Sequence, residues 1–138
     1  MPVKPESALY KRMKENLLNC RITRIESRVG LGIPDCLIAF PGKFVMVELK
    51  VVKRGRKVAL SPHQVAFHVV HAEMKVPTFI LVQYFPPGET VGAKSELLLY
   101  EGKQVEQVHN LGIDANPLDS WRLTGPAWHM LRLRLLGL

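Results

Sequence analysis

The sequence contains few cysteines, few acidic residues and no long apolar segment. Its two cysteines, Cys20 and Cys36, lie among apolar residues, where we expect reduced thiols in a protein core. Two cysteines without a paired Cys-His pattern exclude a thiolate zinc cluster. No apolar run reaches the roughly 20 residues of a membrane helix, and the first residues lack the apolar core of a signal peptide. The sequence therefore predicts a soluble cytoplasmic protein that does not bind a membrane.

The shortage of acidic residues gives the chain a strong positive charge. Its 138 residues include 19 lysines and arginines against 12 aspartates and glutamates, a formal net charge of +7. A basic balance in a small domain favours a polyanionic partner, usually a nucleic acid, although a generic basic protein would have the same composition. An apolar content of 47% is typical of a globular chain. The length predicts one domain over residues 1–138, with a core at about 6–100 and a variable segment at 103–138.

Three charged residues interrupt two strongly apolar segments. Asp35 stands at the head of the first segment (34–40), and Glu48 and Lys50 lie near the end of the second (44–52). Side chains alternate between the two faces of a strand, so Glu48 and Lys50 share a face. In an antiparallel hairpin Asp35 and Glu48 become neighbours at one edge of the sheet. Such charges need a common explanation, because burying an unpaired charge is costly.

The two carboxylates could bind the same hard cation. Mg²⁺ prefers oxygen ligands and typically takes one or two carboxylates with waters and a substrate phosphate. The backbone carbonyl of Leu49 could add a ligand. Lys50 could then orient an attacking water or neutralise charge on the phosphate in the transition state. The alternative is a structural ion-pair network, which is less favoured because the strands are apolar and basic residues surround the same edge.

The rest of the chain predicts an α/β domain with a central mixed sheet. A strand, a helix and a further strand in succession indicate a parallel crossover. Residues 103–138 are harder to interpret: we expect a helical turn within 116–123, and the end of the chain fits a helix or a strand. The other expected elements are helices at 6–19 and 62–75 and strands at 21–28, 34–40, 44–52, 78–84 and 96–100, with a hairpin turn at Pro41-Gly42.

The first expected helix has a carboxylate on its apolar face. At 100° per residue Glu6 falls in the same stripe as Leu9 and Met13, whereas Glu15 falls on the opposite face. The helix dipole also favours a glutamate in the first turn, which explains the position of Glu6 but not its face. Glu6 is therefore the candidate for a further site carboxylate, with Glu15 or Glu26 as a substitute.

The second expected helix has a well-marked start and an unusual pattern. Ser61 suits the N-cap, Pro62 the first helical position and Gln64 the capping box. Two apolar stripes, which include Val69 and Val70, flank a polar line, so the helix must be covered twice. The sheet is one cover, and the C-terminal segment or a second subunit is the other, which predicts a homodimer. The polar line consists of Gln64, His68, His71 and Lys75; we expect its histidines on a polar face.

The pair Pro34-Asp35 followed by Glu48-Leu49-Lys50 resembles the PD-(D/E)XK nuclease signature. The Gly-Ile-Pro-Asp lead, the Glu-Leu-Lys strand and Gln64 on the next helix are most similar to the VRR-NUC branch, which is related to Holliday-junction resolvases. The resemblance covers about residues 6–84 and implies a restriction-endonuclease-like core in αβββαβ order. It implies hydrolysis of DNA phosphodiester bonds with Mg²⁺ or Mn²⁺.

The resemblance also implies roles for individual residues. Asp35 and Glu48 would be metal ligands, Lys50 the catalytic lysine and Gln64 the helix glutamine that supports the site. Glu6 best matches the family's first-helix carboxylate. The implied function is a DNA endonuclease selective for junctions or branches, as suits a bacterium or phage; the alternatives are a non-catalytic nucleic-acid-binding module and a structural basic domain. The residues expected to contact DNA phosphates are Arg28, Lys53, Arg54, Arg56 and Lys57.

Overall fold

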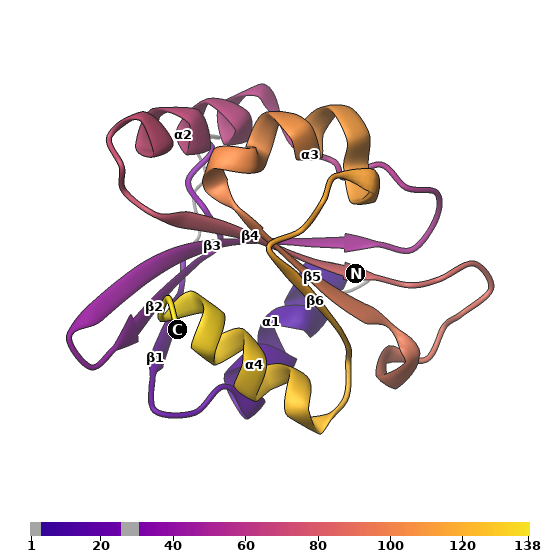
Figure 1. Ribbon diagram of the computed structural model, residues 1–138. Coiled ribbons are helices and arrows are strands. Elements are labelled where there is room, and N and C mark those ends of the chain that lie inside the picture. Colours follow the sequence, from indigo (N-terminus) through magenta and orange to yellow (C-terminus); the bar gives the residue numbers. More distant parts are fainter. Residues whose placement is uncertain (1–3, 26–30) are drawn as a thin grey trace.

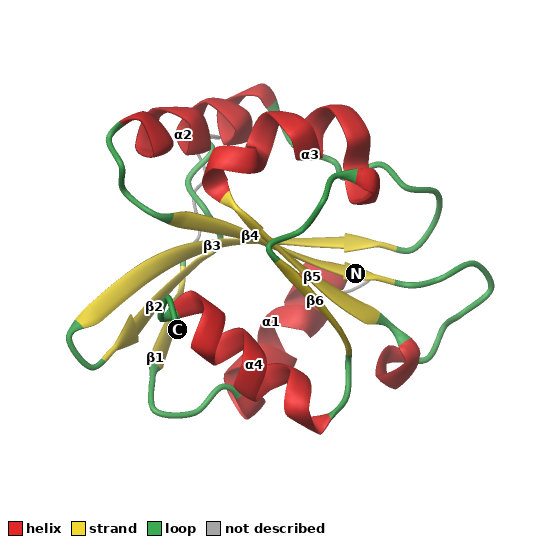
Figure 2. Ribbon diagram, viewed as in Figure 1, coloured by secondary structure: helices red, strands yellow, loops and turns green. Residues whose placement is uncertain are grey.

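Apolar segments with turn residues between them build a six-stranded mixed sheet with helices on both faces (Figures 1 and 2). The computed structural model describes residues 4–25 and 31–138. In space the strands follow their order in the chain, and among the described strands only the β3–β4 pair is parallel. The main elements are α1 (Pro5–Asn16), β1 (Arg21–Arg24), β2 (Cys36–Phe40), β3 (Lys43–Val52), α2 (Pro62–Glu73), β4 (Thr78–Tyr84), β5 (Glu96–Glu101), α3 (Val105–Leu111), β6 (Asp119–Arg122) and α4 (Gly125–Leu135). Short 3-10 helices are η1 (Gly92–Lys94), η2 (Gly102–Gln104) and η3 (Gly112–Asp114).

The hairpin and the crossover predicted from the sequence are confirmed. Strands β2 and β3 pair antiparallel, and Cys36 lies opposite Val47. The turn between them contains Gly42 at φ 75°, a left-handed conformation that glycine adopts readily. Helix α2 then returns the chain so that β4 runs parallel to β3, with Val82 beside Lys50. The αβββαβ order and the α/β class are therefore as expected.

The sheet separates two apolar cores (Figure 1). Helices α1 and α4 cover one face, and α2 and α3 cover the other. On β3, Val47 and Leu49 belong to the core beneath α1 and α4, whereas Val52 belongs to the opposite core. Because side chains alternate along a strand, Glu48 and Lys50 lie on the same side as Val52 and face α2.

Helix α1 orients its side chains as the apolar stripe predicted. Leu9 and Met13 are fully buried, and Glu15 is exposed on the other side. The helix is shorter than expected, ending at Asn16. No helix among residues 4–25 and 31–138 is long and apolar enough to cross a bilayer.

The C-terminal third departs from the sequence prediction. A helical turn within 116–123 is wrong, because Asp119–Arg122 forms β6 and pairs antiparallel with β5. Helix α3 was not expected, and the open choice near the end of the chain is resolved as a helix. Strand β6 is stabilised by its pairing with β5, in which Trp121 lies opposite Leu97. The local sequence does not reveal this pairing.

Helix α2 also departs from its expected orientation. His68 in the polar line is fully buried, so its placement on an exposed polar face is wrong. Val70 and Met74 remain 47% and 71% exposed, although α3 lies beside α2. The helix therefore turns Gln64 and His68 of the polar line toward the sheet, where Lys50 and Thr78 are their partners.

Candidate active site

Asp35 lies where β2 and β3 separate. The last pair between these strands is Cys36 with Val47, and one residue further on the Asp35 Oδ2 accepts a hydrogen bond from the Leu49 N–H at 2.8 Å. The Asp35 carbonyl accepts from the Ile25 N–H at 2.7 Å. The N–H and C=O of one strand residue point to the same side, so the Leu49 carbonyl faces the gap beside Asp35. The hairpin thus directs oxygen atoms from both of its strands into one place.

Glu48 occupies a buried position beside Asp35. Its side chain is 1% exposed, and its Oε1 has no hydrogen-bond partner within the described part of the chain. Burial raises the pKa of Glu48 well above its usual range. A hydrogen bond that protonated Glu48 donates to the Asp35 carboxylate and the negative charges of Asp35 and Glu6 raise this pKa further. The positive charge of Lys50 opposes this rise in pKa. A buried carboxylate oxygen without a partner is a position where a cation would be favoured.

Lys50 is held by the start of α2. Its Nζ donates to Gln64 Oε1 at 3.0 Å, and the same oxygen accepts from the Ser61 N–H at 3.0 Å. The Ser61 hydroxyl accepts from the Gln64 N–H at 3.1 Å, which completes a capping box. Gln64 therefore serves the helix cap and the lysine at once, and the capping box fixes the amide that holds Lys50.

Glu6 approaches the hairpin from the other side. It lies in the first turn of α1, is partly buried, and its charge acts on Glu48. Among the described residues no three His, Cys, Asp or Glu side chains lie together closely enough for a metal site. Glu6 is thus near the two carboxylates without joining them as a third ligand. Of the substitutes, Glu15 points away, and Glu26 lies outside the described residues.

The donor set fits a hard divalent cation. Asp35 and Glu48 provide carboxylate oxygens, and Leu49 adds a backbone carbonyl, which are the ligand types that Mg²⁺ and Mn²⁺ prefer. The unpartnered Glu48 oxygen is the observation that most favours a cation here. These are the residues that would hold the ion, and Lys50 lies beside them.

The basic residues expected to bind DNA lie mostly on the exposed loop after β3. Lys53, Arg54 and Lys57 are exposed there, whereas Arg28 lies outside the described residues. The Lys53 Nζ is 5.7 Å from the centroid of the Phe85 ring. A groove of about 120 Å³ is lined by both Lys53 and Arg12. Arg12 on α1 is therefore a further positively charged residue beside those expected to contact DNA phosphates.

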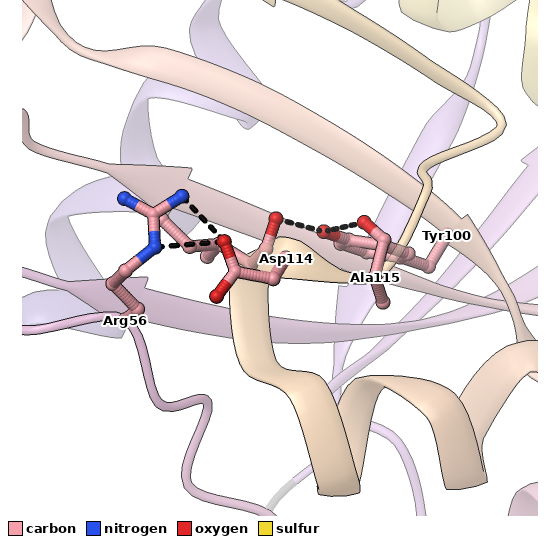
Figure 3. A network of polar contacts seen from close by, with 5 residues as sticks. Arg56, Tyr100, Asp114 and Ala115 are labelled. Atoms are coloured by element: carbon pink, nitrogen blue, oxygen red, sulfur yellow. Dashed lines mark hydrogen bonds and ion pairs between the residues drawn. The ribbon is translucent and has the colours of Figure 1, made fainter.

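Arg56 differs from its neighbours because it has an acidic partner (Figure 3). Its Nε and Nη2 lie 2.8 and 2.6 Å from Asp114 Oδ1, and its carbonyl accepts from the Ile113 N–H at 2.9 Å. The Tyr100 hydroxyl donates to the Ala115 carbonyl at 3.0 Å and so fixes the same segment. These contacts join the basic loop to η3. Asp114 occupies two of the five N–H donors of this guanidinium and offsets its charge, so Arg56 should attract a phosphate less strongly than Lys53 or Arg54.

One residue near the site was missed in the sequence. Arg24 lies opposite Cys36, and its Nη2 donates to the Ser7 hydroxyl at 2.9 Å. Its guanidinium is 5.3 Å from the centroid of the Tyr10 ring. Arg24 thus joins β1 to the helix that contains Glu6. No local signal marks this arginine, because its place depends on the pairing of β1 with β2.

Gly32 allows α2 to approach the hairpin. It has φ 72°, and a Cβ there would collide with the backbone of His63 and Gln64. We expect Gly32→Ala to lower the free energy of unfolding by about 1–3 kcal/mol and to displace Gln64 from Lys50. Urea denaturation measures the first effect. Gly42→Ala is the control, since it shares the positive φ but has open space around it; equal losses in both variants would contradict the collision.

The fold defines an α/β protein with a mixed sheet, and its candidate site combines two carboxylates, a lysine and a glutamine. No protein-family model and no curated protein sequence match the chain. Among solved structures it is similar to Hjc, a Holliday junction resolvase from the archaeal hyperthermophile Archaeoglobus fulgidus. The identity is 13% and the TM-score 0.41, over 69% of this chain and 74% of that chain. A likeness at this level says nothing about the residues of the site.

Proposed function

We propose that the protein is a metal-dependent DNA endonuclease that hydrolyses phosphodiester bonds. The observation that most supports this is the meeting of Asp35, Glu48 and Lys50 at the point where β2 and β3 separate, with one buried Glu48 oxygen left without a partner. The PD-(D/E)XK resemblance assigns the same three residues to catalysis. We further propose that it prefers branched DNA or junctions, as the resolvase-like pattern implies.

The residues divide the work of hydrolysis as follows. Asp35, Glu48 and the Leu49 carbonyl would hold Mg²⁺ or Mn²⁺, with Glu6 as an additional carboxylate nearby. The bound ion would supply Lewis acidity toward the phosphate and lower the pKa of water. Lys50 donates one N–H to Gln64. Its other two N–H groups can donate to a phosphate oxygen or orient the attacking water. Gln64 keeps the ammonium in place while this happens.

A cleavage assay tests the proposal directly. Linear duplex, flap, four-way junction and single-stranded DNA are incubated with and without Mg²⁺, with Asp35→Ala as the control variant. We expect metal-dependent cutting, greatest on a branched substrate, and none by Asp35→Ala. Absence of cutting on all four substrates in Mg²⁺ and Mn²⁺ would refute the endonuclease.

A non-catalytic nucleic-acid-binding module is the second candidate. It is favoured by the position of Glu6, since the described residues contain no cluster of three ligating side chains. Such a module would bind the same DNA structures without needing Mg²⁺ and would cut none of them. The same cleavage assay, run beside a filter-binding measurement, separates the two functions.

The basic loop should contribute to DNA affinity by neutralising phosphates. We expect Lys53→Ala/Arg54→Ala to weaken metal-free DNA binding and to lower the slope of log K against log salt by about 0.9 for each phosphate that is no longer neutralised. Fluorescence anisotropy over a salt series measures this slope. Lys43→Ala is the matched control, because Lys43 begins the strand whose far end leads into the loop. An unchanged slope in the double variant would remove the loop from the interface.

We also propose a homodimer. Val70 and Met74 on the outer side of α2 are exposed and apolar, as a subunit interface requires. Two sites in one dimer could cut two strands of a junction. Sedimentation at low protein concentration is the test, and a clean monomer would refute the dimer.

A further inference from the structure

Helix α2 meets the sheet through a histidine. His68 is the helix's only fully buried residue among those described, with 0% exposure. Val65 and Val69 are only partly buried against the core. Large apolar side chains are usual at such a position, because burying an imidazole without all its hydrogen bonds costs free energy. A histidine there needs an explanation beyond packing.

The histidine forms one of two polar contacts between α2 and the sheet. Its Nδ1 lies 2.7 Å from the hydroxyl oxygen of Thr78, the first residue of β4. Within the described chain, the other side-chain hydrogen bond that joins α2 to a strand is that between Gln64 and Lys50. Gln64 and His68 are four residues apart, so they are neighbours on one face of the helix. Whatever moves His68 along or away from the sheet also moves Gln64.

Gly102 packs against the contact between His68 and Thr78. A Cβ at Gly102 would collide with the Thr78 hydroxyl and would come within 3.1 Å of His68 Nδ1. The backbone of η2 therefore packs directly on the pair. Thr78 itself lies opposite Met46, in the same parallel pairing that sets Val82 beside Lys50. The contact between His68 and Thr78 thus fixes the position of α2 relative to β3 and β4, and β3 contains Glu48 and Lys50.

The ring is neutral, which suits its place near a lysine. Its Nε2 has no partner among the described residues. Burial, followed by the charges of His71 and Lys50, lowers the pKa of His68 to about 4. At neutral pH the ring therefore adds no second positive charge beside the Lys50 ammonium.

We propose that His68 is a positioning residue for Lys50: its bond to Thr78 fixes α2 over β3 and β4 and thereby places the Gln64 oxygen that holds the lysine. The catalytic consequence rests on the proposed nuclease function, whereas the geometry does not. A helix seated by packing alone would give at least equal stability, since an apolar side chain removes a buried unpartnered atom. The cost of the histidine is explained if precise placement of Lys50 is what it provides.

Four variants separate this role from ordinary packing. His68→Leu and Thr78→Val keep the volume approximately and remove the hydrogen bond. His68→Asn keeps an amide at the position of Nδ1, and Thr78→Ser keeps the hydroxyl. Thermal unfolding of each variant is followed by circular dichroism, and should His68→Leu fail to fold, Thr78→Val provides the same comparison.

The readout is the ¹⁵N NMR signal of the Lys50 ammonium in lysine-labelled protein, assigned by its loss in Lys50→Arg. We expect this signal to move to the position of exposed lysines in His68→Leu and Thr78→Val and to persist in His68→Asn and Thr78→Ser. An unchanged Lys50 signal in the Leu and Val variants would overturn the proposal. A shift of the Lys50 signal in all four variants would also overturn the proposal, because His68→Asn and Thr78→Ser keep the hydrogen bond and should keep the signal in place.

Kinetics test the consequence for catalysis. The Leu and Val variants should lose about 10–100-fold in kcat, as is usual for residues that orient a reacting group through another residue, while metal-free DNA affinity stays unchanged. Full kcat in these two variants would refute a positioning role. If the wild type cuts no DNA, the nuclease proposal fails, and the NMR comparison still decides whether His68 positions Lys50.

Discussion

Glu48→Gln should abolish DNA cleavage and at the same time stabilise the protein. Glutamine keeps the shape of the side chain but cannot supply a carboxylate to a divalent cation. Losing one such ligand should reduce cleavage at least about 10²–10³-fold, because cation stabilisation of the transition state is worth several kcal/mol. Glu48 is also costly to the fold, because above the ordinary carboxyl pKa the buried side chain must either take up a proton or bury a charge, and its Oε1 has no partner among the described residues. Its removal should raise the free energy of unfolding by about 1–3 kcal/mol.

The difference in stability between the wild type and Glu48→Gln should increase as the pH rises. The folded-state pKa of Glu48 is raised by burial and by Asp35, so its contribution to stability is complete below the ordinary carboxyl pKa of about 4.3 and is lost as the pH rises toward the folded value. The wild type should therefore become progressively less stable than Glu48→Gln above about pH 4. Urea denaturation between pH 4 and pH 9 measures the difference. Glu15→Gln, on the exposed side of α1, should show no such divergence; a constant difference for Glu48→Gln would contradict the raised pKa.

Lys50→Ala should lose catalysis without losing DNA binding. The ammonium is the only cationic group that the described structure attaches to the Gln64 amide, and its remaining N–H groups would act on the phosphate or the water. Removing one such preorganised donor typically costs about 10²–10³-fold in kcat. Single-turnover cleavage of a preferred substrate measures the rate, and anisotropy measures affinity. We expect the Kd to change by less than about threefold, since the other cations still neutralise most of the phosphates.

The control for this prediction lies on the same strand. Lys43 stands at the beginning of β3 and Lys50 near its end, so Lys43→Ala removes the same charge from the same element away from the site. Wild-type rates for Lys43→Ala and a large loss for Lys50→Ala would support the assignment. Equal rates for both variants and the wild type would remove Lys50 from the mechanism.

Much of the site could be predicted because it depends on local patterns. The period-two alternation of β3 places Glu48 and Lys50 on one face, and the turn at Gly42 brings Asp35 beside them. The helical stripe of α1 likewise distinguishes Glu6 from Glu15. These inferences need only the geometry of a strand, a turn or a helix, and the structure brings the hairpin residues together as that geometry requires.

The remaining features depend on partners that are distant in the sequence. His68 is polar, so the pattern of α2 assigned it to the outside, and only Thr78 on the next strand makes its burial tolerable. Strand β6 has few apolar residues and is ordered by pairing with β5. Arg24 reaches Ser7 only because of the register of β1. The pattern of apolar and polar residues in the sequence cannot predict such features, because each depends on a contact with a distant residue rather than on polarity.

The meeting of α4 with α1 sets an order of events during synthesis. The Arg132 Nε donates to the Leu18 carbonyl at 3.0 Å across 114 residues of chain, and Leu131 and Leu135 share a core with Leu9 and Met13. At a translation rate of about 5–20 residues per second, the ribosome needs roughly 6–23 s after α1 to produce α4, whereas β3, on which α1 packs, is made much sooner. Glu6 belongs to α1. A nascent chain therefore contains every proposed catalytic residue, from Glu6 to Gln64, well before α4 completes the core that Leu9 and Met13 share.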